Sequence, residues 1–123
     1  MGTDEQARAV GELFNIIGHI YGVRTGRRTY IRLSANTPEP DEQQLLLREL
    51  GGKMMFHIHS KHVWELSQYY AVIAALNKLQ PYLTGIKLQA AETALLMEYA
   101  HRPAERWAIA EHVRQLVRYG ATR

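Results

Sequence analysis

The apolar residues of this chain change spacing twice, from the helical period of about 3.6 to the strand period of two. A helix is expected over residues 4–17, where a capping box at residues 3–6 precedes an apolar face that ends at Gly18. From His19 to Leu33 the apolar residues alternate around Thr25-Gly26, which predicts a β-hairpin. A second helix, ended by Gly51-Gly52, then precedes a second alternating stretch. This order predicts an α+β fold with an antiparallel sheet.

The second half of the chain is expected to be helical. Helices are predicted over residues 69–79, 86–100 and 103–119, and the first of these is stopped by Pro81. The expected order is therefore α-β-β-α-β-β-α-α-α, within one domain spanning the 123 residues, 1–123. No apolar run approaches the ~20 residues of a membrane span, and the start of the chain lacks the pattern of a signal peptide. We expect a soluble, intracellular protein of the cytoplasm or nucleoid, without a membrane partner.

The turn positions predict how the strands pair. A two-residue turn at Thr25-Gly26 would place the following pairs opposite each other: Ile20 and Ile31, Tyr21 and Tyr30, Val23 and Arg28. The second hairpin joins Lys53–His59 to Val63–Ser67, and a two-residue turn at Ser60-Lys61 would put Trp64 beside the histidines. A three-residue loop at residues 60–62 puts Trp64 beside Ile58 and Glu65 opposite His57. We take the three-residue loop.

The positive charge is concentrated on the first hairpin. The formal charge of +3 is modest, but the segment from His19 to Ala35 contains four arginines and no acid. The predicted pairing places these groups on the polar faces of the hairpins, with Arg24, Arg27 and Lys61 at the tips: Tyr21, Arg28, Tyr30, Arg32, Ser34, Lys53, Met55, His57, His59 and Glu65. Arginine binds guanine or phosphate, and serine and histidine add hydrogen bonds, so the face suits double-stranded DNA. A solvated sheet face is the alternative.

Three histidines lie close together in the sequence of the second hairpin. His57 and His59 share one strand face and His62 is near, a spacing that can hold a metal. No carboxylate is obviously placed to complete such a site, so we expect groove-facing polar histidines instead. Because the chain has no cysteine, disulfides and zinc-thiolate sites are excluded.

Four segments, in order and at matching distances, resemble segments of the LAGLIDADG homing endonucleases. Residues 10–18, VGELFNIIG, are similar to the motif that ends the first helix of that family. LSANT at 33–37 resembles its passage from strand to helix, and RELGG at 48–52 resembles the end of its second helix. LQPYL at 79–83, followed by KLQA at 87–90, resembles its third helix and the segment beyond. The resemblance covers residues 9–100.

This resemblance implies an αββαββα fold with additional C-terminal helices, whose sheet forms a saddle in the major groove of a pseudo-palindromic site. A single copy of the motif implies a homodimer in which the first helices meet at a two-fold axis. The residues expected at this interface are Val10, Gly11, Leu13 and Phe14. Glu12 departs from the small residue that the family prefers at its position.

The resemblance also implies that the catalytic site is altered. The family's metal-binding acid corresponds to Ile17 here, and the earlier acid of the motif corresponds to Asn15. A basic residue of the homodimeric members matches Ile86, beside Lys87. Without a carboxylate at residue 17, magnesium has no anchor and no water is activated against the phosphodiester. No catalytic residue is therefore assigned.

We expect a DNA-binding protein of homing-endonuclease ancestry that does not cut, with a role such as transcriptional regulation and no cofactor. The alternative is a working, magnesium-dependent endonuclease whose metals are held by Glu12 or Asn15. A structural or protein-binding role is the third reading. The residues expected to contact DNA are Tyr21, Arg24, Arg27, Arg28, Tyr30, Arg32, Ser34, Lys53, His57, His59, Lys61 and Lys87.

Overall fold

The structure of the chain, a computed structural model, describes residues 2–26, 28–56 and 62–120. Its elements are α1 (Gly2–Ile17), β1 (Gly18–Thr25), β2 (Arg28–Asn36), α2 (Pro40–Leu50), β3 (Lys53–Phe56), β4 (His62–Leu66), α3 (Tyr69–Leu79), η1 (Gln80–Tyr82), α4 (Gly85–Leu95), η2 (Leu96–Tyr99) and α5 (Pro103–Gly120). The order confirms the α+β succession expected from the sequence. The helix expected to run to residue 100 instead ends at Leu95 and continues as the 3-10 turn η2.

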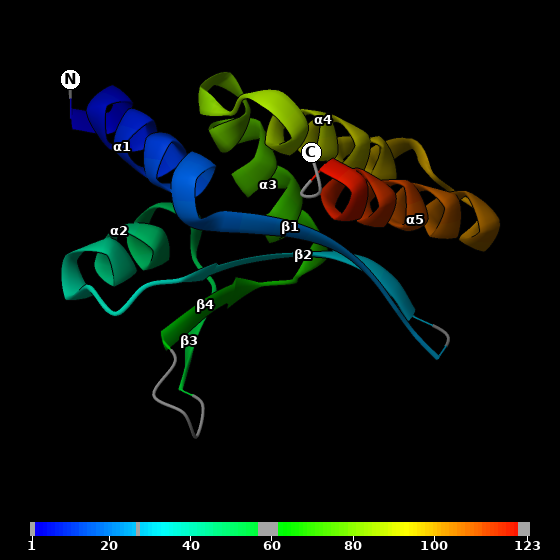
Figure 1. Ribbon diagram of the computed structural model, residues 1–123, viewed down its shortest axis with the longest axis horizontal. Coiled ribbons are helices and arrows are strands. Elements are labelled where there is room, and N and C mark those ends of the chain that lie inside the picture. Colours follow the sequence, from blue (N-terminus) through cyan, green and yellow to red (C-terminus); the bar gives the residue numbers. More distant parts are fainter. Residues whose placement is uncertain (1, 27, 57–61, 121–123) are drawn as a thin grey trace.

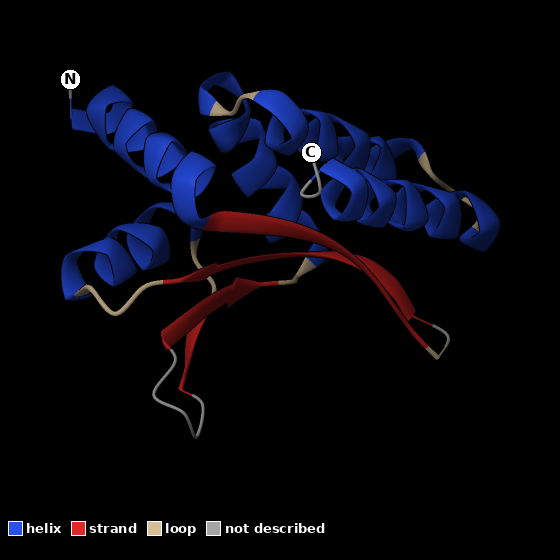
Figure 2. Cartoon of the chain, in the orientation of Figure 1, coloured by secondary structure: helices blue, strands red, loops and turns tan. Residues whose placement is uncertain are grey.

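The four strands form one antiparallel sheet in the order β1-β2-β4-β3. Helices α1, α3, α4 and α5 lie on one side of this curved sheet, and the other side is open (Figures 1 and 2). Helix α2 packs beside α1 and β4. None of the helices in the described ranges is long and apolar enough to cross a membrane. The arrangement leaves one face of the sheet uncovered by helices, and we call this the open face.

The register of the first hairpin differs from the expected one by two residues. Thr25 pairs with Arg28, Tyr21 with Arg32 and Ile20 with Leu33. The turn therefore begins at Gly26, whose φ of 55° lies in the left-handed region that glycine adopts without strain. The prediction that Tyr21 faces Tyr30 was wrong, because Gly26 occupies the first central position of the turn and not the second. A shift of two residues preserves the face on which each side chain lies.

The register of the second hairpin also differs. Glu65 lies opposite Lys53 on β3 and Ser34 on β2, so the expected pairing of Glu65 with His57 was wrong. Trp64 lies opposite Met54 rather than Ile58. His57, Ile58, His59 and Lys61 fall outside the described residues. The predicted alternation of faces again holds, because the shift is an even number of residues.

The core lies between the sheet and the helix layer. Trp64 of β4 is 0% exposed, its ring meets Phe14 of α1 edge to face at 6.3 Å between centroids, and its Nε1 donates to the Gly51 carbonyl at 2.7 Å. Other fully buried side chains come from both layers, namely Ile20, Leu33, Leu46, Leu76, Leu79 and Val113. Burying such side chains stabilises each by about 1.5–3 kcal/mol and fixes which face of the sheet remains open.

Helix α5 approaches β1 so closely that only glycine fits at one position. A Cβ built on Gly22 would lie 2.6 Å from the Ala110 carbonyl carbon and 2.8 Å from its Cα. Real Cβ atoms do not approach backbone atoms this closely, so Gly22 permits direct backbone contact between β1 and α5. The contact holds the C-terminal helix on the covered side of the sheet.

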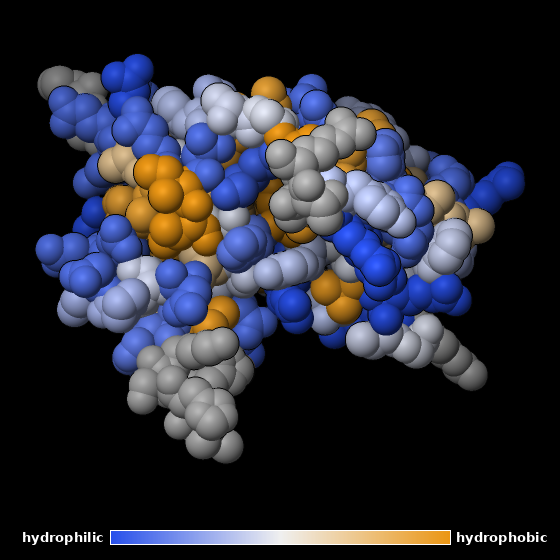
Figure 3. Space-filling view, in the orientation of Figure 1, coloured by the Kyte–Doolittle hydropathy of each residue, from blue (hydrophilic) through white to orange (hydrophobic). Residues whose placement is uncertain are grey.

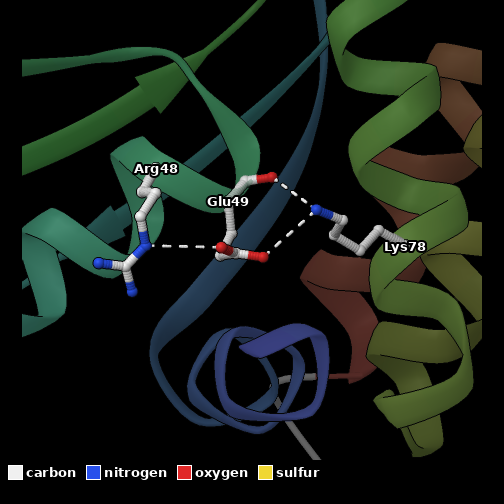
Figure 4. A network of polar contacts seen from close by, with 3 residues as sticks. All are labelled: Arg48, Glu49 and Lys78. Atoms are coloured by element: carbon white, nitrogen blue, oxygen red, sulfur yellow. Dashed lines mark hydrogen bonds and ion pairs between the residues drawn. The ribbon is translucent and has the colours of Figure 1, made fainter. Parts of the chain in front are cut away.

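A network of three side chains joins α2 to α3 (Figure 4). The Glu49 carboxylate is 8% exposed and accepts from Lys78 Nζ at 3.4 Å, and Arg48 Nε lies 3.5 Å from its other oxygen. Lys78 Nζ also donates to the Glu49 carbonyl at 3.0 Å. The nearly buried carboxylate is thus paired with two cations, as a buried charge requires.

Candidate nucleic-acid interface

Alternate residues of each strand point away from the helix layer and form the open face. Ile20, Ile31 and Leu33 point into the core, so their strand neighbours point outward. The outward set consists of His19, Tyr21, Val23, Thr25, Arg28, Tyr30, Arg32, Ser34, Asn36, Lys53, Met55, Val63 and Glu65. Within the described part of the strands, this set holds three permanent cations and one acid, Glu65. The open face is therefore basic.

A hollow of about 420 Å³ occupies the middle of the open face. It is lined by His19, Tyr21, Arg32, Ser34, Asn36, Val63 and Glu65. The Arg32 guanidinium lies over the Tyr21 ring at 5.1 Å, and the His19 ring stacks on the Tyr21 ring with 5.8 Å between the ring centroids. Arg32 Nε lies 4.0 Å from Glu65 Oε1, too far for a hydrogen bond, and Nε has no hydrogen-bond partner. This nitrogen is also buried, so the accessible donors of Arg32 are its two terminal nitrogens.

Arg28 lies at the outer end of the open face, near the tip of the first hairpin. It is exposed, and its guanidinium carbon lies 4.8 Å from the centre of the Tyr30 ring. A cation–π contact positions the planar guanidinium while its N–H donors stay free. Arg28 is therefore available to a phosphate or a base edge.

Ser34 and Lys53 flank Glu65 across the sheet. Ser34 is 8% exposed and lies opposite both His19 and Glu65, whereas Lys53 is exposed. Both residues were expected on the polar face, and the structure places both there, one on each side of Glu65. The other candidates on the hairpins, Arg27, His57, His59 and Lys61, lie outside the described residues.

Arg24 does not share the open face with Arg28 and Arg32. Its guanidinium lies 5.2 Å from the centre of the Trp107 ring of α5, on the helix-covered side. Arg24 was expected among the DNA-contacting residues, and the structure places it apart from the others, against α5. The signal was present in the sequence, because Arg24 has the same parity along the strand as the buried Ile20.

Lys87, in the first turn of α4, reaches the C-terminal end of α1. Its Nζ donates to the carbonyls of Asn15 at 2.8 Å and Phe14 at 3.3 Å. The Asn15 side chain completes the junction, since its Oδ1 accepts from the Thr84 backbone N–H at 3.1 Å and its Nδ2 donates to Thr84 Oγ1 at 3.2 Å. An ammonium at a helix C-terminus is favourable because the helix dipole is negative there.

The end of α1 does not fit a divalent metal site. The Ile17 side chain supplies no oxygen ligand, the Asn15 side chain is engaged by Thr84, and the Lys87 ammonium donates to the Asn15 carbonyl. Burial lowers the pKa of Lys87, and burial together with the charge of Lys87 lowers the pKa of His19. In the described ranges, no three His, Asp or Glu side chains are grouped so as to hold a metal. The charged group that binds this helix end is therefore an ammonium, and the charge there is positive.

Three of the four residues expected at a dimer interface pack inside this chain. Val10 and Phe14 are 0% exposed, and Gly11 is buried against the Tyr82 ring. The exposed side of α1 instead carries Glu12 and Ile16, the latter 78% exposed, with Leu13 half-buried beside them. Figure 3 shows a hydrophobic patch over the C-terminal half of α1. The buried stripe of α1 therefore faces the core of its own chain.

The fold is shared with homing endonucleases. The chain is similar to the homing endonuclease I-CvuI in complex with its target in the presence of calcium, with a TM-score of 0.62 and 19% identity over 94% of this chain and 85% of that one. It is also similar to I-CvuI with an I-CreI target in the presence of magnesium, where the DNA is not cleaved, with a TM-score of 0.57 and 17% identity over 97% of each chain.

The homing endonuclease I-TnaI gives a TM-score of 0.59 and 13% identity over 93% of this chain and 96% of that one. The chain matches no known family model and no curated protein. At these identities the likeness establishes the fold, and it confirms the homing-endonuclease-like architecture expected from the sequence.

Proposed function

We propose that this protein binds double-stranded DNA through the open face of its sheet and does not cut it. The observation that carries the proposal is a basic, helix-free sheet face with Arg28, Arg32 and Lys53 on a fold whose solved neighbours include one bound to its target. Side chains of an exposed sheet reach base edges from the major groove, while cations contact phosphates. Arg24 is not included in this interface, because it stacks on Trp107.

The absence of cleavage is supported by the end of α1. Hydrolysis by a metal requires carboxylate oxygens to hold the ion and a bound water to attack phosphorus. Here residue 17 is isoleucine and the Lys87 ammonium is fixed 2.8 Å from the Asn15 carbonyl oxygen. A regulatory role, in which occupancy of a DNA site is the output, follows from binding without cutting. An active endonuclease is the competing function, because the neighbours of known fold are homing endonucleases.

We also propose that two copies of the chain bind one pseudo-palindromic site. Ile16 and Leu13 on the outer side of α1 provide an apolar contact surface, next to the exposed Arg8–Glu12 ion pair of 3.8 Å. An exposed isoleucine in an apolar patch is a typical element of a subunit interface. A two-fold axis through α1 would make the contact self-complementary.

The test is an incubation of the purified protein with a randomised duplex library, with magnesium in one arm and EDTA in the other. Sequencing of the bound fragments and of new DNA ends separates the functions. The proposal expects selected sequences in both arms and no new ends in either. The variant Arg28→Ala should weaken binding, and Arg114→Ala on α5 should not, because Arg114 lies in the helix layer.

New ends that appear only with magnesium would contradict the claim that the protein does not cut, and they would establish the endonuclease. Absence of any duplex binding, even at low salt, would contradict DNA binding itself, since phosphate contacts strengthen as salt falls.

A further inference from the structure

Glu65 is the one acid among the described outward residues of the open face. Its side chain is 24% exposed and lines the central hollow with Arg32 and Tyr21. It does not belong to the nearly buried ion-pair network of α2 and α3, and its contact with Arg32 is a loose one of 4.0 Å. A carboxylate in this position needs an explanation on a surface that meets DNA.

A carboxylate facing a duplex repels the phosphates and loses water when the surface is covered. This cost is offset only if the carboxylate pairs with a cation or accepts a hydrogen bond from the DNA. In the major groove, the donors offered by the bases are the exocyclic amino groups of cytosine and adenine. Glu65 therefore fits a place where one of these amino groups approaches.

The contacts of Arg32 indicate which of these two amino groups, that of cytosine or that of adenine, approaches Glu65. The Arg32 guanidinium is stacked on Tyr21, the side chain is 36% exposed and lines the hollow, whereas Nε is buried, so the two terminal nitrogens are the donors that a ligand in the hollow can reach. Two neighbouring donors of arginine match the O6 and N7 acceptors of guanine. In an A·T pair the adenine N6 donor lies between the two acceptors, adenine N7 and thymine O4, so the pair does not match this fork.

A single base pair offers both the acceptors that Arg32 requires and the amino donor that Glu65 requires. On the major-groove edge of G·C, guanine N7 and O6 are followed by the cytosine N4 amino group, and O6 and N4 are hydrogen-bonded neighbours. An arginine and a glutamate 4.0 Å apart present donors and acceptors in the same order. The Tyr21 ring packs against the guanidinium at 5.1 Å and Glu65 Oε1 lies 4.0 Å from Arg32 Nε, so the pair is prearranged.

We propose that Arg32 and Glu65 together read one G·C base pair, Arg32 donating to guanine and Glu65 accepting from cytosine N4. The proposal rests on the proposed function, because it assigns part of the sequence preference of the open face. In this account Arg32 and Glu65 determine specificity, whereas Arg28 and Lys53 supply affinity that does not depend on sequence.

The test repeats the library selection with four variants of the full chain: Arg32→Ala, Arg32→Lys, Glu65→Gln and, as a control on the same face, Lys53→Ala. Affinities are then measured for the selected duplex and for the same duplex with A·T in place of the G·C pair that the wild type selects. Circular dichroism and thermal unfolding of each variant show that it is folded.

The wild-type selection is expected to contain an invariant G·C pair at one position. Arg32→Ala should lose that preference and weaken binding by about 10- to 100-fold, and Arg32→Lys should lose it while retaining the salt dependence, because lysine keeps the charge without the fork. Glu65→Gln should admit A·T, since an amide can pair with adenine N6 and N7, and the preference for G·C should fall about tenfold. Lys53→Ala should weaken binding to all duplexes alike.

An unchanged base preference at every position in Arg32→Lys and Glu65→Gln, with binding retained, would overturn this inference and leave DNA binding intact. Failure of the wild-type protein to bind any duplex would instead refute the proposed function.

Discussion

The variant Arg28→Ala tests the proposed interface through the salt dependence of DNA binding. Arg28 is exposed at the outer end of the open face, and the only contact described for its guanidinium is the Tyr30 ring at 4.8 Å. An arginine in this position neutralises one phosphate in the complex and releases the counterions condensed on it. The logarithm of the binding constant then falls with the logarithm of salt concentration by about 0.9 for each such contact.

The expected change follows from this value. Removing Arg28 lowers the slope by about 0.9 for one bound chain and by about 1.8 for a dimer. Between 50 mM and 200 mM salt, the advantage of the wild type over the variant should therefore shrink about 3.5-fold for a chain and about 12-fold for a dimer. Because the side chain is exposed, the free energy of unfolding should change by less than about 0.5 kcal/mol.

The assay is fluorescence anisotropy of a labelled duplex titrated with protein at several salt concentrations. Arg28→Lys, which keeps the charge, should retain the wild-type slope, and Arg114→Ala on α5 serves as the control in the helix layer. Equal slopes for wild type and Arg28→Ala would refute the assignment of Arg28 to a phosphate contact. A reduced slope in Arg114→Ala would show that the duplex lies on the other side of the molecule.

Three further predictions concern stability and assembly. Gly22→Ala should lower the free energy of unfolding, measured by urea denaturation, by about 3 kcal/mol, because the new Cβ would overlap the Ala110 carbonyl and push α5 away from β1. A loss below about 1 kcal/mol would contradict this packing. Ile16→Asp, at a position 78% exposed, should leave folding intact and abolish the dimer in sedimentation equilibrium, whereas a wild type that stays monomeric at all concentrations would disprove the dimer. Burial, with Lys87 nearby, lowers the pKa of His19 below 6.5, so the folded state disfavours its charged form. The free energy of unfolding should therefore fall as the pH drops from above 6.5 through the folded pKa. The variant His19→Gln should remove this part of the pH dependence, and a pH profile identical to that of the wild type would contradict the prediction.

The faces of the sheet could be predicted from the sequence, although the registers could not. The period of two assigns Tyr21, Arg28 and Arg32 to one face under any even shift, and this assignment survived the two-residue error at Gly26. The choice between Thr25-Gly26 and a turn starting at Gly26 depends on packing across the whole sheet, which the local sequence does not contain. Arg24 was instead placed by its position near the tip, although its parity along the strand, which is that of the buried Ile20, indicated the helix-covered side.

The composition of the end of α1 could be predicted from the sequence only in part. The absence of a carboxylate at Ile17 could be read from the sequence, but the position of Lys87 could not, because 72 residues separate it from Asn15. Only the packing of α4 on α1 brings the ammonium to the helix end. The apolar face of α1 could be predicted from the spacing of its residues, and Val10 and Phe14 on that face are fully buried, but the spacing does not tell whether such a face packs on its own core or on a second copy.

The claim that the open face binds DNA without a metal is tested most directly by photocross-linking. The protein is cross-linked, in EDTA, to a selected duplex that carries bromouracil. Mass spectrometry of the linked peptides is expected to place the cross-links on β1 and β2, at Tyr21 and Tyr30. Cross-links confined to Trp107 and Tyr119 of α5, or binding that disappears when divalent ions are removed, would contradict the account.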